Sequence, residues 1–165
     1  MHPYSFLASV MWLVSGMIAA AADAPMAPPE VDIRAIAEVE ARQVEQGREV
    51  RKLLPADRVV SGDWIIYTLE VRNITPAAIP APTVTYPVPE HVSYVADSAV
   101  GPAAEVSYSI DGGRSFDGPE NLKLQDTDGQ RRLAVATEYT HIRWQLKHGL
   151  KANSVAFLRF RARVK

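Results

Sequence analysis

The residue types that could carry out catalysis or bind a metal are scattered along this chain. The four histidines are His2, His91, His141 and His148, and the closest pair in sequence, His141 and His148, is separated by a predicted strand end. Metal-binding histidines usually recur at short, fixed spacings, so we interpret all four as ordinary surface residues. The chain has no cysteine, which excludes disulfides, thiolate catalysis and cysteine-bound zinc.

One segment resembles the beginning of a calcium-binding loop. Asp126-Thr127-Asp128-Gly129 carries two carboxylates with one residue between them, whereas calcium needs about six or more oxygens that converge on one point. The third acidic position and the distal glutamate of the full motif are missing. Asp111 and Asp117 would contribute only if the fold brought them close. We therefore predict a solvated loop, with neither a metal site nor a cofactor.

No catalytic motif is recognisable in the sequence. It contains neither a Gly-x-Ser-x-Gly nucleophile elbow nor a glycine-rich phosphate loop, and its carboxylates are not paired by any familiar spacing. We predict that the protein is not an enzyme and has no catalytic residues. Asn73-Ile74-Thr75 matches the glycosylation pattern, but we interpret Asn73 as the residue that ends a strand.

The remaining candidates are residues that would bind a partner. Positive side chains occupy every second position near residue 165, and we call this set the cationic stripe: Arg159, Arg161, Arg163 and Lys165. On a strand they would share one face. Such a stripe either protects a solvated sheet from aggregation or docks an anionic envelope polymer or an acidic partner. Charge runs are usually only solvated, and we keep both interpretations open.

Two tryptophans are possible stacking platforms for a ligand. Trp144 shares its predicted face with Ile142 and Leu146, so we assign it to the core. Trp64 lies on the polar face of its predicted strand, and it is therefore the better candidate for binding a small ligand or a carbohydrate.

A central strand must position these side chains. Residues 64–72 alternate with period two after the turn Ser61-Gly62-Asp63, which is typical of a half-buried strand. The apolar face carries Ile65, Tyr67, Leu69 and Val71. The opposite face carries Trp64, Ile66, Thr68, Glu70 and Arg72, and we expect it to be polar. One apolar face is not stable alone, so further strands must cover it.

The segment from Val31 to Ala41 also alternates with period two. Its alanines and glutamates favour a helix, but we give the period more weight and predict a strand. Glu45-Gln46-Gly47 then predicts a hairpin connection to a second strand, Arg48 to Leu54.

Short strands are expected through the rest of the chain, at residues 83–86, 92–95, 105–110, 141–146 and 156–164. Asp111-Gly112-Gly113 predicts a hairpin that returns at Arg114-Ser115-Phe116. Residues 117–132 are polar and predict a long surface loop. If the last strand paired with residues 140–146, Arg143 would join the cationic stripe.

Length and composition limit the domain organisation. A chain of 165 residues fits one ordinary domain, and its net charge of −1 offers no overall field for nucleic acid or membrane. Residues 1–22 resemble a secretory signal peptide, with an apolar run from Phe6 to Ile18 and then four alanines. The alternative is a membrane anchor, but an apolar stretch of 17 residues (22 − 6 + 1) is barely long enough to span. Residues 23–30 then form a linker, and residues 31–165 form the domain.

Many short strands with turn signals between them predict an all-β, antiparallel β-sandwich. Three stretches make the chain resemble a bacterial surface-protein repeat family, the domain of unknown function eleven. They are Gly62-Asp63 with Tyr67 and Asn73, then 87–95 (PVPEHVSYV) with Asp97-Ser98, and finally Ile142-Arg143-Trp144 with the last apolar strand. Two positions depart from the family pattern: Ser61 replaces a proline, and Ile74 replaces a small residue.

The resemblance implies an immunoglobulin-like β-sandwich, export from the cell and no catalytic residues. We therefore predict an exported, non-catalytic module of the cell envelope, periplasmic or extracellular, that acts by contact in adhesion, assembly or scaffolding. Its expected partner is an envelope protein or an anionic envelope polymer, and not nucleic acid. The alternative is a module that binds a small ligand or a carbohydrate, and an enzyme comes third.

The apolar run that ends in Ala19 to Ala22 generates the first testable prediction. Signal peptidase prefers small residues before its cleavage site, so the mature chain is expected to begin near Asp23. N-terminal sequencing of the exported protein checks this. Recovery of an intact Met1 on membrane-bound protein would show that the segment is an anchor.

Overall fold

The computed structural model describes residues 30–165, apart from the side chains of residues 41–43, 45 and 51. The predicted signal peptide, and all of the predicted linker except Glu30, lie outside the described residues, as does His2. Within the described part, no helix is both long enough and apolar enough to cross a membrane.

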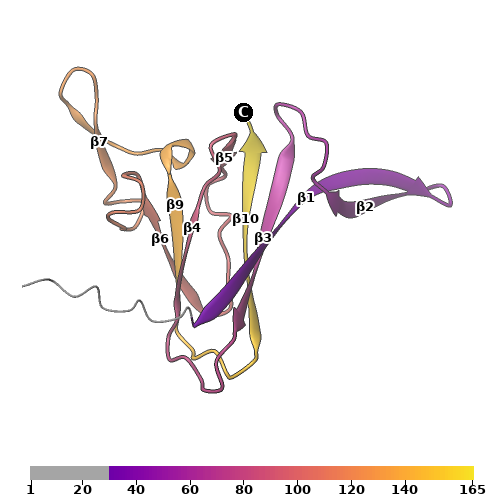
Figure 1. Cartoon of the computed structure of the whole chain (residues 1–165). Coiled ribbons are helices and arrows are strands. Elements are labelled where there is room, and N and C mark those ends of the chain that lie inside the picture. Colours follow the sequence, from indigo (N-terminus) through magenta and orange to yellow (C-terminus); the bar gives the residue numbers. More distant parts are fainter. Residues whose placement is uncertain (1–29) are drawn as a thin grey trace, which may run out of the picture.

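The described residues form an all-β structure of antiparallel open sheets (Figure 1), as the sequence predicted. The larger sheet has the strand order β2-β1-β3-β10-β5. Its strands are β1 (Val31–Glu45), β2 (Arg48–Pro55), β3 (Trp64–Asn73), β5 (Val92–Tyr94) and β10 (Val155–Val164). The smaller sheet has the order β4-β9-β6, made by β4 (Thr83–Pro87), β6 (Ala104–Ser109) and β9 (His141–Leu146).

The central strand is confirmed as β3, which lies between β1 and β10. Its predicted apolar face is buried: Ile65, Tyr67, Leu69 and Val71. Its other face was expected to be polar, and the structure shows that Ile66 and Thr68 on this face are also buried. Their neighbours across the strand pair are Arg161 and Arg159, whose long aliphatic stems cover apolar surface while their charged ends stay in water.

The Ala- and Glu-rich segment is a strand, as its period predicted, and not a helix. The first part of β1 pairs with β3 as far as Val39, and the remainder pairs with β2 alone. Gln46 and Gly47 both have positive φ, 52° and 77°, which suits the two-residue hairpin turn between these strands. The outer part of β1 and β2 therefore projects from the sheets as a two-stranded ribbon (Figure 1).

The two larger sheets contribute side chains to one apolar core. Phe160 of β10 stacks on Tyr67 of β3 with ring centroids 4.8 Å apart, and Trp144 of β9 lies 6.3 Å from Phe160. Tyr94 and Tyr108 join the sheets at another point through a hydrogen bond of 2.9 Å between their hydroxyls. Tyr67 and Trp144, both predicted to be inward-facing, are buried in one cluster together with Phe160.

Two predicted connections are wrong. The chain after Asp111 does not return as a strand, and it meets β6 again only at the Tyr108–Asp117 bridge. The reason is that the Asp111 carboxylate accepts hydrogen bonds from the backbone N–H groups of Arg114 and Ser115, which closes a wider loop. The expected surface loop at 117–132 instead contains a small hairpin, β7 (Lys123–Gln125) and β8 (Arg131–Leu133), followed by the 3-10 turn η1 (Ala136–Glu138).

The predicted addition of Arg143 to the cationic stripe is also wrong. The strand that carries Arg143, β9, pairs with β4 and β6, whereas β10 pairs with β3 and β5. The Arg143 guanidinium lies 3.5 Å from the centre of the Phe116 ring. Arg143 therefore belongs to the smaller sheet, whereas the cationic stripe belongs to the larger one. Alternation shows which residues share a face of a strand, but it does not show which strands are neighbours.

Asn73 ends β3, and its side chain is fully buried. Its amide N–H groups donate to the backbone carbonyls of Ala77, Leu150 and Lys151, and its carbonyl oxygen accepts from Thr75. Because the amide is buried and hydrogen-bonded at both ends, the structure favours the interpretation as a strand terminator over a glycosylation site. The side chain fastens the loop after β3 to the loop before β10.

Truncation of the central strand tests this core. Leu69 is fully buried, and Leu→Ala changes in a core typically cost about 2–5 kcal/mol. We expect Leu69→Ala to lower the melting temperature by roughly 5–20 °C, measured by thermal unfolding followed by circular dichroism. Leu133→Ala is the matched control because Leu133 is half exposed. Equal melting temperatures for the two variants would contradict the packing described above.

Candidate functional site

The cationic stripe lies on the outer face of the larger sheet, away from the core. Arg159, Arg161 and Arg163 are exposed members of β10, between the buried Leu158, Phe160 and Ala162, as predicted. Lys165 follows the end of β10 and is also exposed. Successive cationic positions are roughly 6.5–7 Å apart along an extended strand, so the stripe is a regular row of positive charge.

Aromatic side chains lie at both ends of the arginine row. The register between β3 and β10 places Trp64 opposite Arg163, and 51% of Trp64 is exposed. Phe157 is 56% exposed and precedes Arg159 on the same face of β10. The sequence analysis did not single out Phe157, although an apolar residue at an outward position of an alternating strand was a detectable signal.

Three of the four charged side chains of the stripe are oriented by hydrogen bonds to neutral oxygen atoms. Arg159 Nε donates to Thr68 Oγ1 at 3.2 Å, Arg163 Nε donates to the Gly62 carbonyl at 3.3 Å, and Lys165 Nζ donates to the Glu90 carbonyl at 2.7 Å. In the part of the chain that the structure describes, no member of the stripe forms an ion pair. These hydrogen bonds therefore orient the cationic side chains but leave their positive charges unpaired with any carboxylate of the described residues.

Acidic side chains occur on the same face but on other strands. By register, Glu38 of β1 lies across β3 from Arg161, since both are opposite Ile66. Glu70 of β3 lies opposite Phe157. Glutamates thus lie across β3 from Arg161 and beside Phe157, whereas Arg163, at the upper end of β10, has Trp64 and Ser93 as its strand neighbours.

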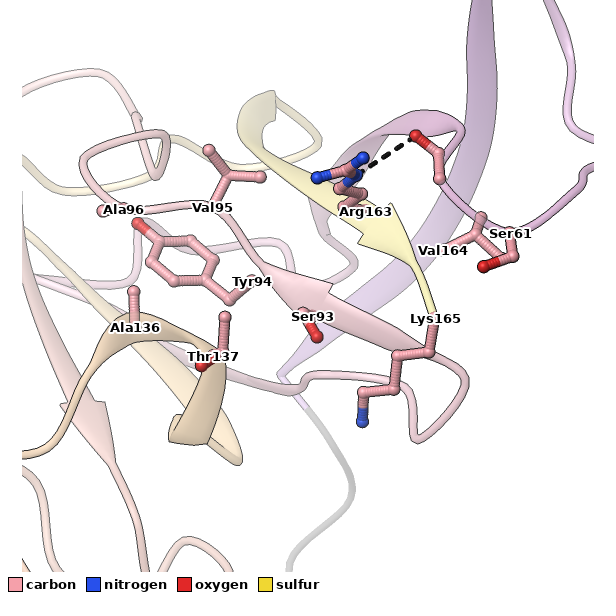
Figure 2. A pocket seen from close by; sticks show the side chains of 11 residues that line it. Ser61, Ser93, Tyr94, Val95, Ala96, Ala136, Thr137, Arg163, Val164 and Lys165 are labelled. Atoms are coloured by element: carbon pink, nitrogen blue, oxygen red, sulfur yellow. Dashed lines mark hydrogen bonds between the residues drawn. The ribbon is translucent and has the colours of Figure 1, made fainter.

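A pocket opens beside this upper end, at the edge of the larger sheet (Figure 2). Its volume is about 540 Å³. Its walls come from the turn before β3, from β5 and the residues after it, from η1 and from the end of β10: Ser61, Gly62, Ser93, Tyr94, Val95, Ala96, Ala136, Thr137, Arg163, Val164 and Lys165. Two members of the cationic stripe therefore line it, while Arg159 and Arg161 do not.

The turn before β3 positions the upper end of the stripe. Gly62 has φ 97°, a conformation that glycine adopts without strain. Its N–H donates to the Val164 carbonyl at 2.9 Å, and the Val164 N–H donates to the Asp63 carbonyl at 2.9 Å. These bonds hold the end of β10 against the start of β3, which keeps Arg163 beside Trp64.

The metal candidates are explained by local structure. Asp126 begins the tight turn between β7 and β8, where its backbone accepts from the Gly129 N–H and its carboxylate accepts from the Thr127 N–H. The Asp111 and Asp117 carboxylates are each bonded within their own loops. Among the described residues, no group of three or more potential ligands could hold a metal ion. His91 and His148 are exposed and His141 is half-buried.

The acidic groups with shifted pKa values also serve the structure. A hydrogen bond from the Ser115 hydroxyl, with others in the same loop, holds the pKa of Asp111 well below its usual range. The Arg132 side chain lowers the pKa of Glu138 to about 2. Since the Glu138 carboxylate also accepts from the Val135 N–H, the Arg132–Glu138 pair holds η1, one wall of the pocket. A lowered pKa means that this support is present above the ordinary carboxyl pKa and is lost as pH falls towards 2.

Comparison with known proteins found no matching family model, no similar curated protein and no similar solved structure. The resemblance to the domain of unknown function eleven therefore stays a prediction, and the residues described above are the only basis for proposals about function.

The turn at residues 126–129 generates a prediction about calcium. Its carboxylates are engaged by backbone N–H groups or stand alone in solvent, so the folded state should gain no stability from the ion. We expect the melting temperature to agree within error in excess chelator and in excess calcium, as measured by differential scanning calorimetry. A rise of several degrees with calcium, lost in Asp126→Asn, would show that this turn binds the ion.

Proposed function

We propose that this chain is an exported, non-catalytic module of the cell envelope, with an immunoglobulin-like sandwich fold, that acts by contact. The cationic stripe docks it to an anionic envelope polymer or an acidic envelope protein, in the periplasm or outside the cell. The single observation that carries the proposal is the row of exposed, unneutralised arginines on β10, with Trp64 and Phe157 at its ends.

The position of β10 favours docking over protection of the sheet. Positive side chains protect a sheet mainly at exposed edge strands, where unpaired backbone groups invite another strand. Strand β10 is not such an edge, because it pairs with β3 on one side and with β5 on the other. Beyond β5, the backbone of Val100 also bonds to that of Arg159. Protection of an exposed edge therefore does not explain the positive charges on β10.

The composition of the face also fits a contact surface. Arginine and large aromatic residues are enriched at protein interfaces, because they combine apolar area with directional hydrogen bonds. Arginine also binds carboxylates and phosphates with paired N–H groups. Here Arg161 and Arg159 lie beside Ile66 and Thr68 in the strand register, and both arginines are exposed at the surface of the sheet.

The small-ligand or carbohydrate-binding module is the second candidate function, and one observation favours it. Trp64 is half exposed and lies opposite Arg163, which itself lines the pocket at the edge of the sheet. An exposed indole can stack on a sugar ring or an aromatic ligand. Glycan-array binding that is lost in Trp64→Ala would support this candidate.

Removal of the arginines tests the docking function. In Arg159→Ser/Arg161→Ser/Arg163→Ser, we expect affinity for anionic envelope fractions to fall roughly tenfold, since exposed charges each contribute a few tenths of a kcal/mol or more. Binding of the unaltered protein should also weaken as salt rises, because charges are screened over about 8 Å at physiological ionic strength. Sedimentation with envelope fractions measures both effects.

The matched control is Lys123→Ser/Arg131→Ser/Lys147→Ser, which removes the same number of positive charges from exposed positions outside the larger sheet. It should bind as the unaltered protein does, and both triple variants should keep its melting temperature within a few degrees. Equal binding by the two variants at low salt would overturn the docking proposal.

A further inference from the structure

The pocket at the edge of the larger sheet has the chemical character of a binding site for an anion. Arg163 and Lys165 both line it, and no acidic side chain is among its lining residues. Arg163 donates a hydrogen bond to the backbone carbonyl of Gly62, and Lys165 donates one to the backbone carbonyl of Glu90. A carbonyl orients a cation but carries no net charge, so neither bond neutralises the charge of the side chain.

The same pocket offers groups that suit a hydroxylated ligand. Ser61, Ser93 and Thr137 supply hydroxyls from three separate segments, and hydroxyls both donate and accept hydrogen bonds. Figure 2 shows Ser93, Thr137 and Lys165 on three separate segments around the pocket. Val95, Ala96 and Ala136 add an apolar wall. A volume of about 540 Å³ is far more than one carboxylate needs and lies within the usual range for small-molecule sites.

The walls of this pocket are fixed before any ligand arrives. The Tyr94 hydroxyl bonds to the Tyr108 hydroxyl at 2.9 Å and accepts from the Ala99 N–H at 3.1 Å. The Arg132–Glu138 pair holds η1 on the opposite side, with Arg132 Nη1 donating to Glu138 Oε2 at 2.8 Å. Preformed walls reduce the ordering cost of binding.

From these observations we propose that the pocket binds one anionic sugar unit, carrying a carboxylate or a phosphate, of a polymer that lies along the cationic stripe. Arg163 and Lys165 both attract the anion, and the sugar hydroxyls bond to Ser93 and Thr137. This deepens the proposed function and rests on it. Continuity supports it, because Arg163 belongs both to the stripe and to the pocket. A polymer on the arginine row therefore reaches the pocket at the row's upper end.

The first experiment measures monomer binding to the purified chain by amide chemical shifts in NMR. The probes are galacturonate for the carboxylate, glucose 1-phosphate for the phosphate, and neutral glucose as the control. We expect one or both anionic sugars to shift the signals of Ser93, Val95 and Thr137 in a saturable way, and glucose to bind at least about tenfold more weakly, because it lacks the charge-assisted hydrogen bonds. Shifts confined to other parts of the chain would overturn the proposal.

Two pairs of variants give the matched comparisons. Thr137→Trp fills the pocket from an exposed position of η1, and Val135→Trp adds the same ring at an exposed position outside the pocket. Lys165→Gln removes a lining charge, and Lys151→Gln removes an exposed charge elsewhere. We expect Thr137→Trp and Lys165→Gln to weaken binding of the anionic sugar by about tenfold or more, and the controls to leave it unchanged. If a variant and its control bound the anionic sugar equally well, the proposal that the sugar binds in this pocket would be wrong.

A polymer experiment separates failure of the pocket from failure of the docking function. The probes are polygalacturonate and neutral dextran, and the variant is Arg159→Ser/Arg161→Ser, which leaves the pocket intact. We expect it to weaken polygalacturonate binding while galacturonate binding is unchanged. If the polymer binds equally well to this variant, the docking function fails. If Thr137→Trp keeps full affinity for galacturonate, only the pocket fails.

Discussion

The register between β3 and β10 is the constraint on which both the core and the candidate site depend. Tyr67 lies opposite Phe160, and their rings stack in the core. Because side chains alternate along each strand, the same pairing places the inward residues of both strands in the core and the arginines of β10 on the outer face. A shift by one residue would turn Phe160 to solvent and an arginine into the core. The burial of Phe160 in the core therefore determines the positions of the arginines on the outer face of β10.

Most of the larger sheet was predictable because its strands alternate clearly. The period of residues 31–41 outweighed a helix propensity, and the last strand's apolar and cationic positions lie where alternation placed them. Alternation reports the environment of a strand's two faces, and in this chain those environments differ sharply. Asn73 was also correctly interpreted as a terminator, although its two bonds to distant carbonyls could not be foreseen, since they depend on where residues 150 and 151 lie.

The remainder depended on information that no local pattern contains. Strand neighbours are decided by the packing of whole sheets, which is why Arg143 is apart from the stripe. The pocket is formed by four segments that are distant in sequence, so no motif indicated it. Ile66 and Thr68 lie beside arginines of another strand, and the loop after Asp111 follows its carboxylate's hydrogen bonds. Short strands such as β7 and β8 are too brief to show a period.

The pairing of β3 with a strand about ninety residues later has a kinetic consequence. Residues Arg159 and Thr68, which share a hydrogen bond, are 91 positions apart, whereas β1, β2 and β3 are consecutive and can pair as soon as they are made. Contacts between distant residues slow folding because a long loop must close first. While β10 is unpaired, β3 has an open edge and lacks the side chains of β10 beside its apolar face, and these are features that favour wrong strand pairing. Final closure of the core then coincides with the assembly of the arginine row, so the contact surface first exists when folding is complete.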